Sequence, residues 1–236
     1  MYVRNLLLIL IVPSILFSQV NSNSNLALNF YLGLPQGEFK QNVDRLGFGL
    51  NGEYLYRPSP IYPFSIGFNL GFLNYGSLTR KEPFSYTIPD VTVDVTNQNN
   101  IINYHLLFQI GRPTGNLRPY IQGYFGGAYI YTQTKITNQS TSEEIASSVN
   151  FEDNAWSYGV GAGIAIKIYS TKMQEPTSSR INDIFLNIKV NYLYGSEAEY
   201  LKEGSIRYLG NGKIAYDVLK SKTDLLGIHL GMIMEF

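Results

Sequence analysis

The sequence contains no cysteine, only one tryptophan and only two histidines among its 236 residues. Without cysteine the chain cannot form disulfide bonds, and it lacks the residue that a lipoprotein needs just after its signal for lipid attachment. Two isolated histidines, His105 and His229, make a poor metal site because such sites bring several ligands together. We therefore expect no metal and no cofactor.

The sequence also has no excess of positive or negative charge. The chain has 18 basic and 18 acidic residues, so its formal net charge is 0. Domains that bind nucleic acid concentrate basic residues on one face. The composition therefore indicates no nucleic-acid partner.

Long hydrophobic runs are absent except for residues 6–17, close to the N-terminus. This run follows a single positive charge and precedes small or polar residues, an order typical of a secretory signal peptide. It is shorter than the roughly 20 apolar residues of a membrane-spanning helix. We predict a cleaved signal peptide at 1–22, with cleavage after Ser22 or Gln19, and one domain at 23–236. A retained N-terminal anchor is the alternative.

The rest of the chain shows alternation of apolar residues with polar or small ones. In the final segment, 225–236, every second residue is large and apolar, and this set is Leu226, Ile228, Leu230, Met232, Met234 and Phe236. The intervening set is Leu225, Gly227, His229, Gly231, Ile233 and Glu235. Because side chains of a strand point alternately to its two faces, a period of two predicts a strand with one apolar face.

The same alternation recurs in seven other segments. They are 26–34, 46–56, 64–72, 102–111, 118–133, 156–168 and 184–195. The segment 118–133 has no clean apolar face, and only Gln122 and Thr132 favour an inward set that includes Tyr120, Tyr124 and Gly126. Repeated segments of about ten residues, apolar on one face and polar or small on the other, are typical of transmembrane β-barrels.

The connections between these segments alternate in length. Those after the second, fourth and sixth segments are 57–63, 112–116 and 170–183, of which the last is long for a turn. Those after the first, third, fifth and seventh are longer and polar, at 35–45, 76–100, 135–154 and 196–222. Outer-membrane barrels have short periplasmic turns and long external loops. We therefore expect the four long connections to lie outside the cell.

A soluble sandwich or lipocalin-like barrel is the alternative fold. It would expose apolar faces such as 26–34 or 64–72 to water, which promotes aggregation. The sequence therefore predicts an all-β fold, an eight-stranded antiparallel up-and-down transmembrane β-barrel that follows a cleaved signal peptide. This fold places the protein in the outer membrane of a Gram-negative bacterium, in contact with lipid and lipopolysaccharide.

Several short stretches carry a family resemblance. They are the signal ending at 16–19, Leu-Pro-Gln-Gly-Glu-Phe at 34–39, Arg-Pro-Tyr at 118–120 with Gly123, Gly126 and Gly127, and the terminal Phe236. In these the chain resembles the eight-stranded outer-membrane barrels that include the OmpA transmembrane domain, the opacity proteins and OmpW. More narrowly, it resembles the outer membrane protein beta-barrel proteins of the Bacteroidetes.

The resemblance implies a route of assembly. In that superfamily a terminal aromatic residue belongs to the signal that the barrel-assembly machinery reads. The resemblance gives this role to Phe236, with Met234 and Met232 as its alternating partners. It also implies periplasmic chaperones as partners during biogenesis, and a monomer as the final state.

Eight strands leave a lumen that side chains can fill. We expect a polar network inside it made of Glu53, His105, Lys167, Lys189, His229 and Glu235. Buried charges must be paired, so we expect Lys167 to share a depth with Glu235 and Glu53 to share one with Lys189. The favoured interpretation is a filled lumen with a structural or surface-interaction role.

Other functions remain open at this stage. A narrow porin-like channel is one alternative, and a loop-mediated adhesin that uses Tyr200, Tyr208 and Tyr216 is another. An enzyme would need a nucleophile and an orienting carboxylate beside a histidine. The residue arrangement His-x-Ser is missing at His229 and nothing comparable surrounds His105. We therefore expect no enzymatic activity.

Overall fold

The computed structural model describes residues 23–85, 88–139, 143–170, 181–209 and 214–236. The expected signal peptide, 1–22, lies outside the described residues, as does most of the connection expected at 170–183.

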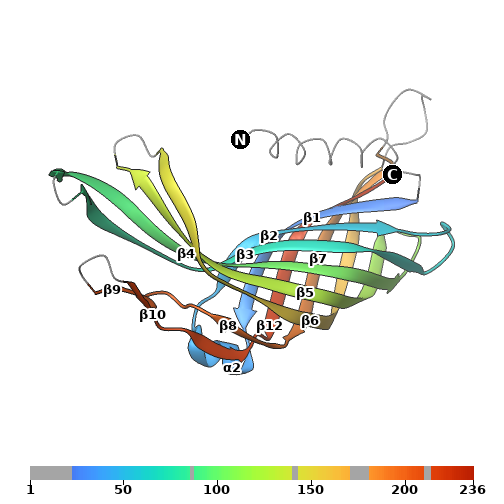
Figure 1. Ribbon diagram of the computed structural model, residues 1–236. Helices are drawn as coiled ribbons and strands as arrows, with labels where there is room; N and C mark the ends of the chain where they lie inside the picture. Colours follow the sequence, from blue (N-terminus) through green and yellow to red (C-terminus); the bar gives the residue numbers. More distant parts are fainter. Residues whose placement is uncertain (1–22, 86–87, 140–142, 171–180, 210–213) are drawn as a thin grey trace, which may run out of the picture.

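Eight strands close into a ring in which each strand pairs antiparallel with its neighbours along the chain, and the first pairs with the last (Figure 1). The strands are β1 (Ser24–Pro35), β2 (Gly47–Tyr56), β3 (Phe64–Ser85), β4 (Ile88–Gly111), β5 (Leu117–Asn138), β6 (Glu144–Ser170), β7 (Asp183–Gly195) and β12 (Leu225–Glu235). The predicted up-and-down barrel is confirmed. Closure leaves the membrane-spanning part without a free sheet edge, so the backbone groups are paired within the ring.

The outer face of the ring is apolar. Phe30 is 73% exposed, Trp156 is 68% exposed and Phe68 is 64% exposed. Residues next to them in sequence, such as Asn29 and Asn69, are buried. A face of this kind is stable against lipid and not against water.

The inward set expected for the fifth segment is also right. Tyr120, Gln122 and Tyr124 are buried inside the barrel, whereas Ile121 and Phe125 are exposed on the outer face. The sequence of this strand shows no clear alternation because its inward residues include large aromatic rings. Since the lumen accommodates such rings, size and polarity do not separate the two faces here.

Glycine permits close packing at two inward positions. A Cβ built on Gly49 would lie 1.7 Å from the carbonyl oxygen of Phe72, and one built on Gly67 would lie 1.8 Å from that of Tyr54. Any side chain there would collide with the backbone of the next strand. Glycine in a strand commonly marks this kind of close backbone approach.

The two ends of the barrel differ. The connections 57–63 and 112–116, the start of β1 and the end of β12 lie together at one end, which we call the turn end (Figure 1). The long connections lie at the opposite end, which we call the hairpin end.

Two long connections were wrongly expected to be loops. β3 and β4 stay paired as far as Ser85 and Ile88, and β5 and β6 stay paired as far as Thr137 and Glu144. The four strands therefore run 22 to 27 residues and project beyond the ring (Figure 1). The projecting part is rich in polar residues and has few apolar side chains on its inner face, such as the buried Val93 and Val95, although its many β-branched residues favour strands.

The other two long connections also contain regular structure. The first holds the short helix α2 (Gly37–Asn42). The last holds two small ladders, β8 (Glu197–Tyr200) with β11 (Leu219–Lys222) and β9 (Ile206–Tyr208) with β10 (Ile214–Tyr216). Within the described residues, no helix is long and apolar enough to cross a membrane.

Candidate functional site: the barrel lumen and its two ends

An ion pair crosses the middle of the lumen. The Nζ atom of Lys189, on β7, forms a salt bridge and hydrogen bond with Oε1 of Glu53, on β2. Their side chains are 0% and 2% exposed. In the ring β1 and β12 lie between β2 and β7, so the pair spans the interior and does not follow the wall.

The carboxylate and the ammonium of this pair have further partners. Gln122 donates from Nε2 to Oε2 of Glu53 at 3.1 Å and is itself held by Tyr124, whose hydroxyl donates to Oε1 of Gln122 at 2.5 Å. The ammonium of Lys189 lies 5.6 Å from the ring centre of Tyr124, within cation–π range. A buried ion pair needs such additional contacts to offset the loss of hydration.

A chain of hydrogen bonds follows the inner wall through every barrel strand except β12. In donor-to-acceptor order its members are Tyr120, Asn187, Asn29, Asn51, Asn69, His105 and Ser157, joined at 2.5, 2.8, 3.2, 2.5, 3.2 and 2.9 Å. All the bonds point the same way around the ring. Such aligned hydrogen bonds polarise one another and specify one arrangement of side chains.

Three members of this chain have the residue types of a catalytic triad. His105 lies between Asn69, at Nδ1, and Ser157, at Nε2. In a working triad the orienting group accepts a hydrogen bond from the Nδ1–H group of the histidine, whereas here the Asn69 amide donates a hydrogen bond to Nδ1. All three residues are deeply buried, at 6%, 3% and 3% exposed. In this geometry the three residues form part of the hydrogen-bonded chain of the inner wall.

The second histidine occupies a separate place in the lumen. His229 stacks on Tyr31, with ring centres 4.5 Å apart, and shares a hydrogen bond of 3.1 Å between its Nε2 and Oδ1 of Asn191. Within the described residues, Nδ1 of His229, the Tyr31 hydroxyl and Nδ2 of Asn103 have no hydrogen-bond partner. Buried polar atoms of this kind are commonly served by ordered water.

Apolar side chains close the lumen at the hairpin end. Phe39, on α2, is 0% exposed and makes edge contacts with the rings of Tyr75 and Tyr200, at 5.7 and 5.1 Å between centres. Tyr75 donates to the carbonyl of Leu201 at 3.0 Å, and Asn42 donates to the Tyr200 hydroxyl at 2.9 Å. The first and last long connections are thereby fastened together over the barrel.

Charged side chains fill the turn end. Arg118 donates from Nη1 to both carboxylate oxygens of Glu235, at 3.1 and 3.0 Å, and its guanidinium lies 4.3 Å from the ring centre of Phe185. Lys167 donates to Asp183 at 2.6 Å. Lys167 and Glu235 do lie at the same end of the barrel, as expected, but they do not pair with each other. Asp183 pairs with Lys167 on the neighbouring strand β6, and this leaves Glu235 to the arginines.

Arg57 follows β2 and reaches into the same end. Its Nη1 donates to the carbonyl of Pro113 at 3.3 Å and lies 3.6 Å from Oε1 of Glu235. Burial lowers the pKa of the Arg57 guanidinium below its usual value; Glu235 opposes this shift and the charge of Arg118 adds to it. Arg57 is thus a cation held in a partly desolvated position close to another cation.

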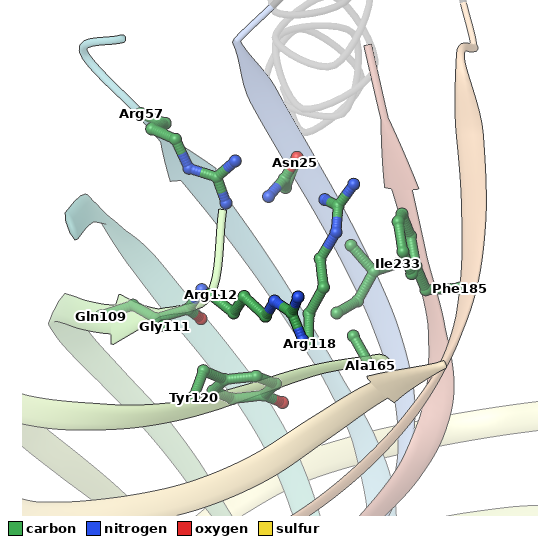
Figure 2. Close-up of a pocket in the computed structure, with 10 residues that line it drawn as sticks. All are labelled: Asn25, Arg57, Gln109, Gly111, Arg112, Arg118, Tyr120, Ala165, Phe185 and Ile233. Carbon is green, nitrogen blue, oxygen red and sulfur yellow. The ribbon is translucent and has the colours of Figure 1, made fainter. Parts of the chain in front are cut away.

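Three arginines surround a small cavity at the turn end. It measures about 20 Å³ and is lined by Asn25, Arg57, Gln109, Gly111, Arg112, Arg118, Tyr120, Ala165, Phe185 and Ile233. Figure 2 shows the three guanidinium groups extending into this space from different parts of the wall. A volume of this size holds about one water molecule.

The structure places all six residues of the expected polar network within the lumen or at its turn end. Glu53 and Lys189 meet, His105 belongs to the hydrogen-bonded chain, and His229 packs on Tyr31. Lys167 and Glu235 lie at the turn end with other partners, as described above. Within the described residues, no group of three His, Asp or Glu side chains could hold a metal ion.

Sequence reasoning missed the two central arginines of the turn end. It assigns Arg57 to a turn and Arg118 to the opening of a strand. The alternation of the strands could have indicated both. Arg57 falls on the same inward-facing set of alternate residues as Asn51 and Glu53, and Arg118 falls on the same inward-facing set as Tyr120. Extending the period of two past the apparent strand ends would have found them.

The residues expected to form the assembly signal lie at the turn end of the last strand. Met232 is 53% exposed on the outer face, and Met234 and Phe236 are half-buried. The backbone N–H of Phe236 donates to the carbonyl of Ser24 at 3.0 Å, so the chain end is fastened to β1. Their role in assembly stays a prediction.

Comparisons with known proteins find weak similarities to solved structures. No family model and no curated protein matches the chain. Among solved structures, Neisserial surface protein A is 10% identical over 91% of this chain and 97% of its own, with a TM-score of 0.36. Ail of Yersinia pestis is 14% identical over 90% and 97%, with a TM-score of 0.35.

A major outer membrane protein of Thermus thermophilus is 11% identical over 90% of this chain and 99% of its own, with a TM-score of 0.37. None of these comparisons bears on the narrower resemblance to Bacteroidetes proteins, which stays a prediction. The fold assignment rests on the closed strand pairing and on which side chains are exposed. With its ring of eight antiparallel strands, apolar outer face and filled interior, the chain is an eight-stranded β-barrel of the outer-membrane type.

Proposed function

We propose that this chain is a non-conducting, non-enzymatic protein of the outer membrane of a Gram-negative bacterium. Its barrel anchors it in the membrane, and its projecting hairpins form a rigid surface outside the cell. The turn end then faces the periplasm and the hairpin end faces outward, as short and long connections do in such barrels.

The observation that carries this proposal is the salt bridge between Glu53 and Lys189 across the lumen. A water-filled pore would hydrate these two charges, yet both side chains are almost fully buried. The apolar cluster around Phe39 adds a second closure on the external side. Eight strands are too few to leave an aqueous channel once side chains of this size fill the interior.

The external surface is built from paired strands and not from loose loops. β4 and β5 remain paired up to Val93 and Asn138, so the two long hairpins share one sheet. Its faces carry polar hydrogen bonds such as those of Thr134 with Asn97 and Asn150, at 2.8 and 2.6 Å. Recognition elements on rigid scaffolds lose little entropy on binding, which favours a surface-interaction role.

A non-enzymatic role is supported by the burial of the histidine–serine contact. Ser157 and His105 face the lumen and take part in the hydrogen-bonded chain. A nucleophile needs room for a substrate carbonyl and donors for the oxyanion beside it. The space next to Ser157 is occupied by the packed interior that also buries Asn69.

Two measurements test the proposal. In a Gram-negative host the mature protein is expected in the outer-membrane fraction, with a gel migration that changes on heating. Liposomes that contain the refolded protein are expected to swell in isotonic sugar no faster than protein-free liposomes. Recovery as a soluble protein without detergent contradicts the location, and rapid swelling contradicts the closed lumen.

A further inference from the structure

We propose that the turn end of the barrel contains a binding site for a small inorganic anion, in the cavity between Arg57, Arg112 and Arg118 (Figure 2). The ligand class is a halide, or a phosphate or sulfate that inserts one oxygen. The site is separate from the central Glu53–Lys189 pair and does not depend on the proposed function.

Among the described residues, positive charge exceeds negative charge around this cavity. The side-chain cations described at the turn end are Arg57, Arg112, Arg118 and Lys167, and the side-chain carboxylates paired with them are Asp183 and Glu235. Both carboxylates are already occupied, Asp183 by Lys167 and Glu235 by Arg118. Arg118 and Arg57 therefore share the single carboxylate of Glu235, at 3.0 and 3.6 Å, and Arg112 forms no salt bridge within the described part of the chain.

Arg112 and Arg57 supply unused hydrogen-bond donors. Arg112 lines the cavity and, among the described residues, its side chain forms no salt bridge. Arg57 is only 8% exposed, its Nε has no hydrogen-bond partner in the described structure, and its pair with Glu235 is long, at 3.6 Å. A buried donor left unpaired is unfavourable. An anion that accepts a hydrogen bond from Arg57 would therefore stabilise the folded barrel.

The shape and the walls of the cavity select the kind of ligand. Its volume of about 20 Å³ admits one atom of the size of a water oxygen or a chloride ion. Phe185, Ala165 and Ile233 form part of the wall, and apolar walls strengthen electrostatic attraction because they exclude water. A cation would be repelled here and a neutral molecule would leave the guanidinium charge uncompensated. Arg112 is exposed at the rim, which gives the anion a route from solvent.

The test uses the refolded full barrel in zwitterionic detergent. Thermal unfolding is followed while sodium bromide, phosphate or sulfate replaces sodium gluconate at constant ionic strength, with gluconate as the bulkier reference anion. We expect stabilisation that saturates at millimolar anion. In Arg112→Gln the half-saturating concentration should rise about tenfold, the loss expected for one charge-assisted hydrogen bond. Comparison of bromide with phosphate and sulfate shows whether a halide or an oxyanion is preferred.

The matched control is Lys220→Gln, which removes one positive charge at the hairpin end, where Lys220 is 60% exposed. It should respond to anions as the unaltered protein does. Crystals grown in bromide should show an anomalous peak between Arg57 and Arg112. Stabilisation that never saturates, an equal effect of the two substitutions, or the absence of bromide from the cavity would each overturn the proposal.

Discussion

Lys189 and Glu53 form a salt bridge across the lumen although two strands, β1 and β12, separate their strands along the wall. The contact therefore crosses the interior of the ring and does not follow its wall. Because both charges are buried, each depends on the other for its compensation.

The pair should show strong energetic coupling. Glu53→Ala or Lys189→Ala leaves one buried charge without its partner and should each cost about 3–5 kcal/mol of unfolding free energy. The double substitution Glu53→Leu with Lys189→Met should recover a large part of this loss, since it leaves no unpaired charge. Urea-induced unfolding in lipid vesicles measures all three. A double variant that is no more stable than the single variants would contradict the coupling of the two charges.

Positions on the lipid face should reject charge. Arginine in place of Leu70, which is 62% exposed on the outer face, or of Leu106 should cost about 2–4 kcal/mol. Arginine at the exposed position Ser148, on the projecting part of β6, serves as the control and should cost little. Unfolding in vesicles is again the measurement, and equal tolerance at Leu70 and Ser148 would contradict a lipid-facing surface.

The neighbouring inward position should fail for a different reason. A Cβ at Gly71 would lie 3.4 Å from Nδ2 of Asn51 and 3.8 Å from a ring carbon of Tyr31. Gly71→Arg should therefore crowd the lumen and block folding even in detergent, whereas Leu70→Arg should still fold in detergent. Gel migration before and after heating distinguishes the two outcomes. Efficient folding of Gly71→Arg would argue against a filled interior.

The orientation can be read from two exposed positions. Cysteine at Ser147, on the projecting part of β6, should react with a membrane-impermeant reagent on intact cells. Cysteine at Thr114, in the connection at the turn end, should react only after the outer membrane is permeabilised. The chain has no native cysteine, so the background is low. Labelling in the reverse pattern would show that the barrel has the opposite orientation in the membrane.

Phe39 should control the closure at the hairpin end. Phe39→Ala removes a fully buried ring from between Tyr75 and Tyr200 and should cost about 3–5 kcal/mol if the site does not collapse. Amide hydrogen exchange should accelerate in α2 while the barrel strands stay protected. Ile61→Ala, at a residue 77% exposed, is the control and should leave exchange in α2 unchanged. Unaltered exchange in Phe39→Ala would show that the ring does not hold α2.

The barrel strands were predictable because lipid and lumen demand opposite side chains at successive positions. Leu226 to Phe236 and Leu26 to Leu34 show this plainly, and both segments are strands as predicted. The contrast is weak in the projecting parts of β3 to β6, where large apolar residues are sparse. Val93 and Val95 are buried and alternate with Asp94 and Thr96, but this run is too short to distinguish a strand from a polar loop, although it forms a ladder with β5.

The helix α2 could not be predicted for another reason. It has six residues, too few for an apolar stripe to show, and it begins at Gly37, whose φ of +54° sets the entry into the turn. Its stability comes from Phe39 inserting between Tyr75 and Tyr200, which are distant along the chain. Tertiary packing of this kind commonly outweighs local propensity in short helices.

The lumen was predictable in composition and only partly in pairing. The inward phase identified Glu53, Lys189 and both histidines. Which groups meet across the interior depends on the stagger of the strands around the ring. Short-range patterns in the sequence do not reveal this stagger. For that reason the sequence suggests a common depth for Glu235 and Lys167, whereas in the structure Glu235 forms salt bridges with Arg118 and Arg57.

Planar-bilayer recording of the refolded protein beside Glu53→Ala and Lys189→Ala tests the closed lumen most directly. The unaltered barrel should show no steady conductance and at most rare, small openings, because the salt bridge and the polar chain fill its middle. At least one of the variants that still folds should open more often, as water enters around the unpaired charge. A stable, large open state of the unaltered protein would contradict a closed lumen and identify the chain as a channel.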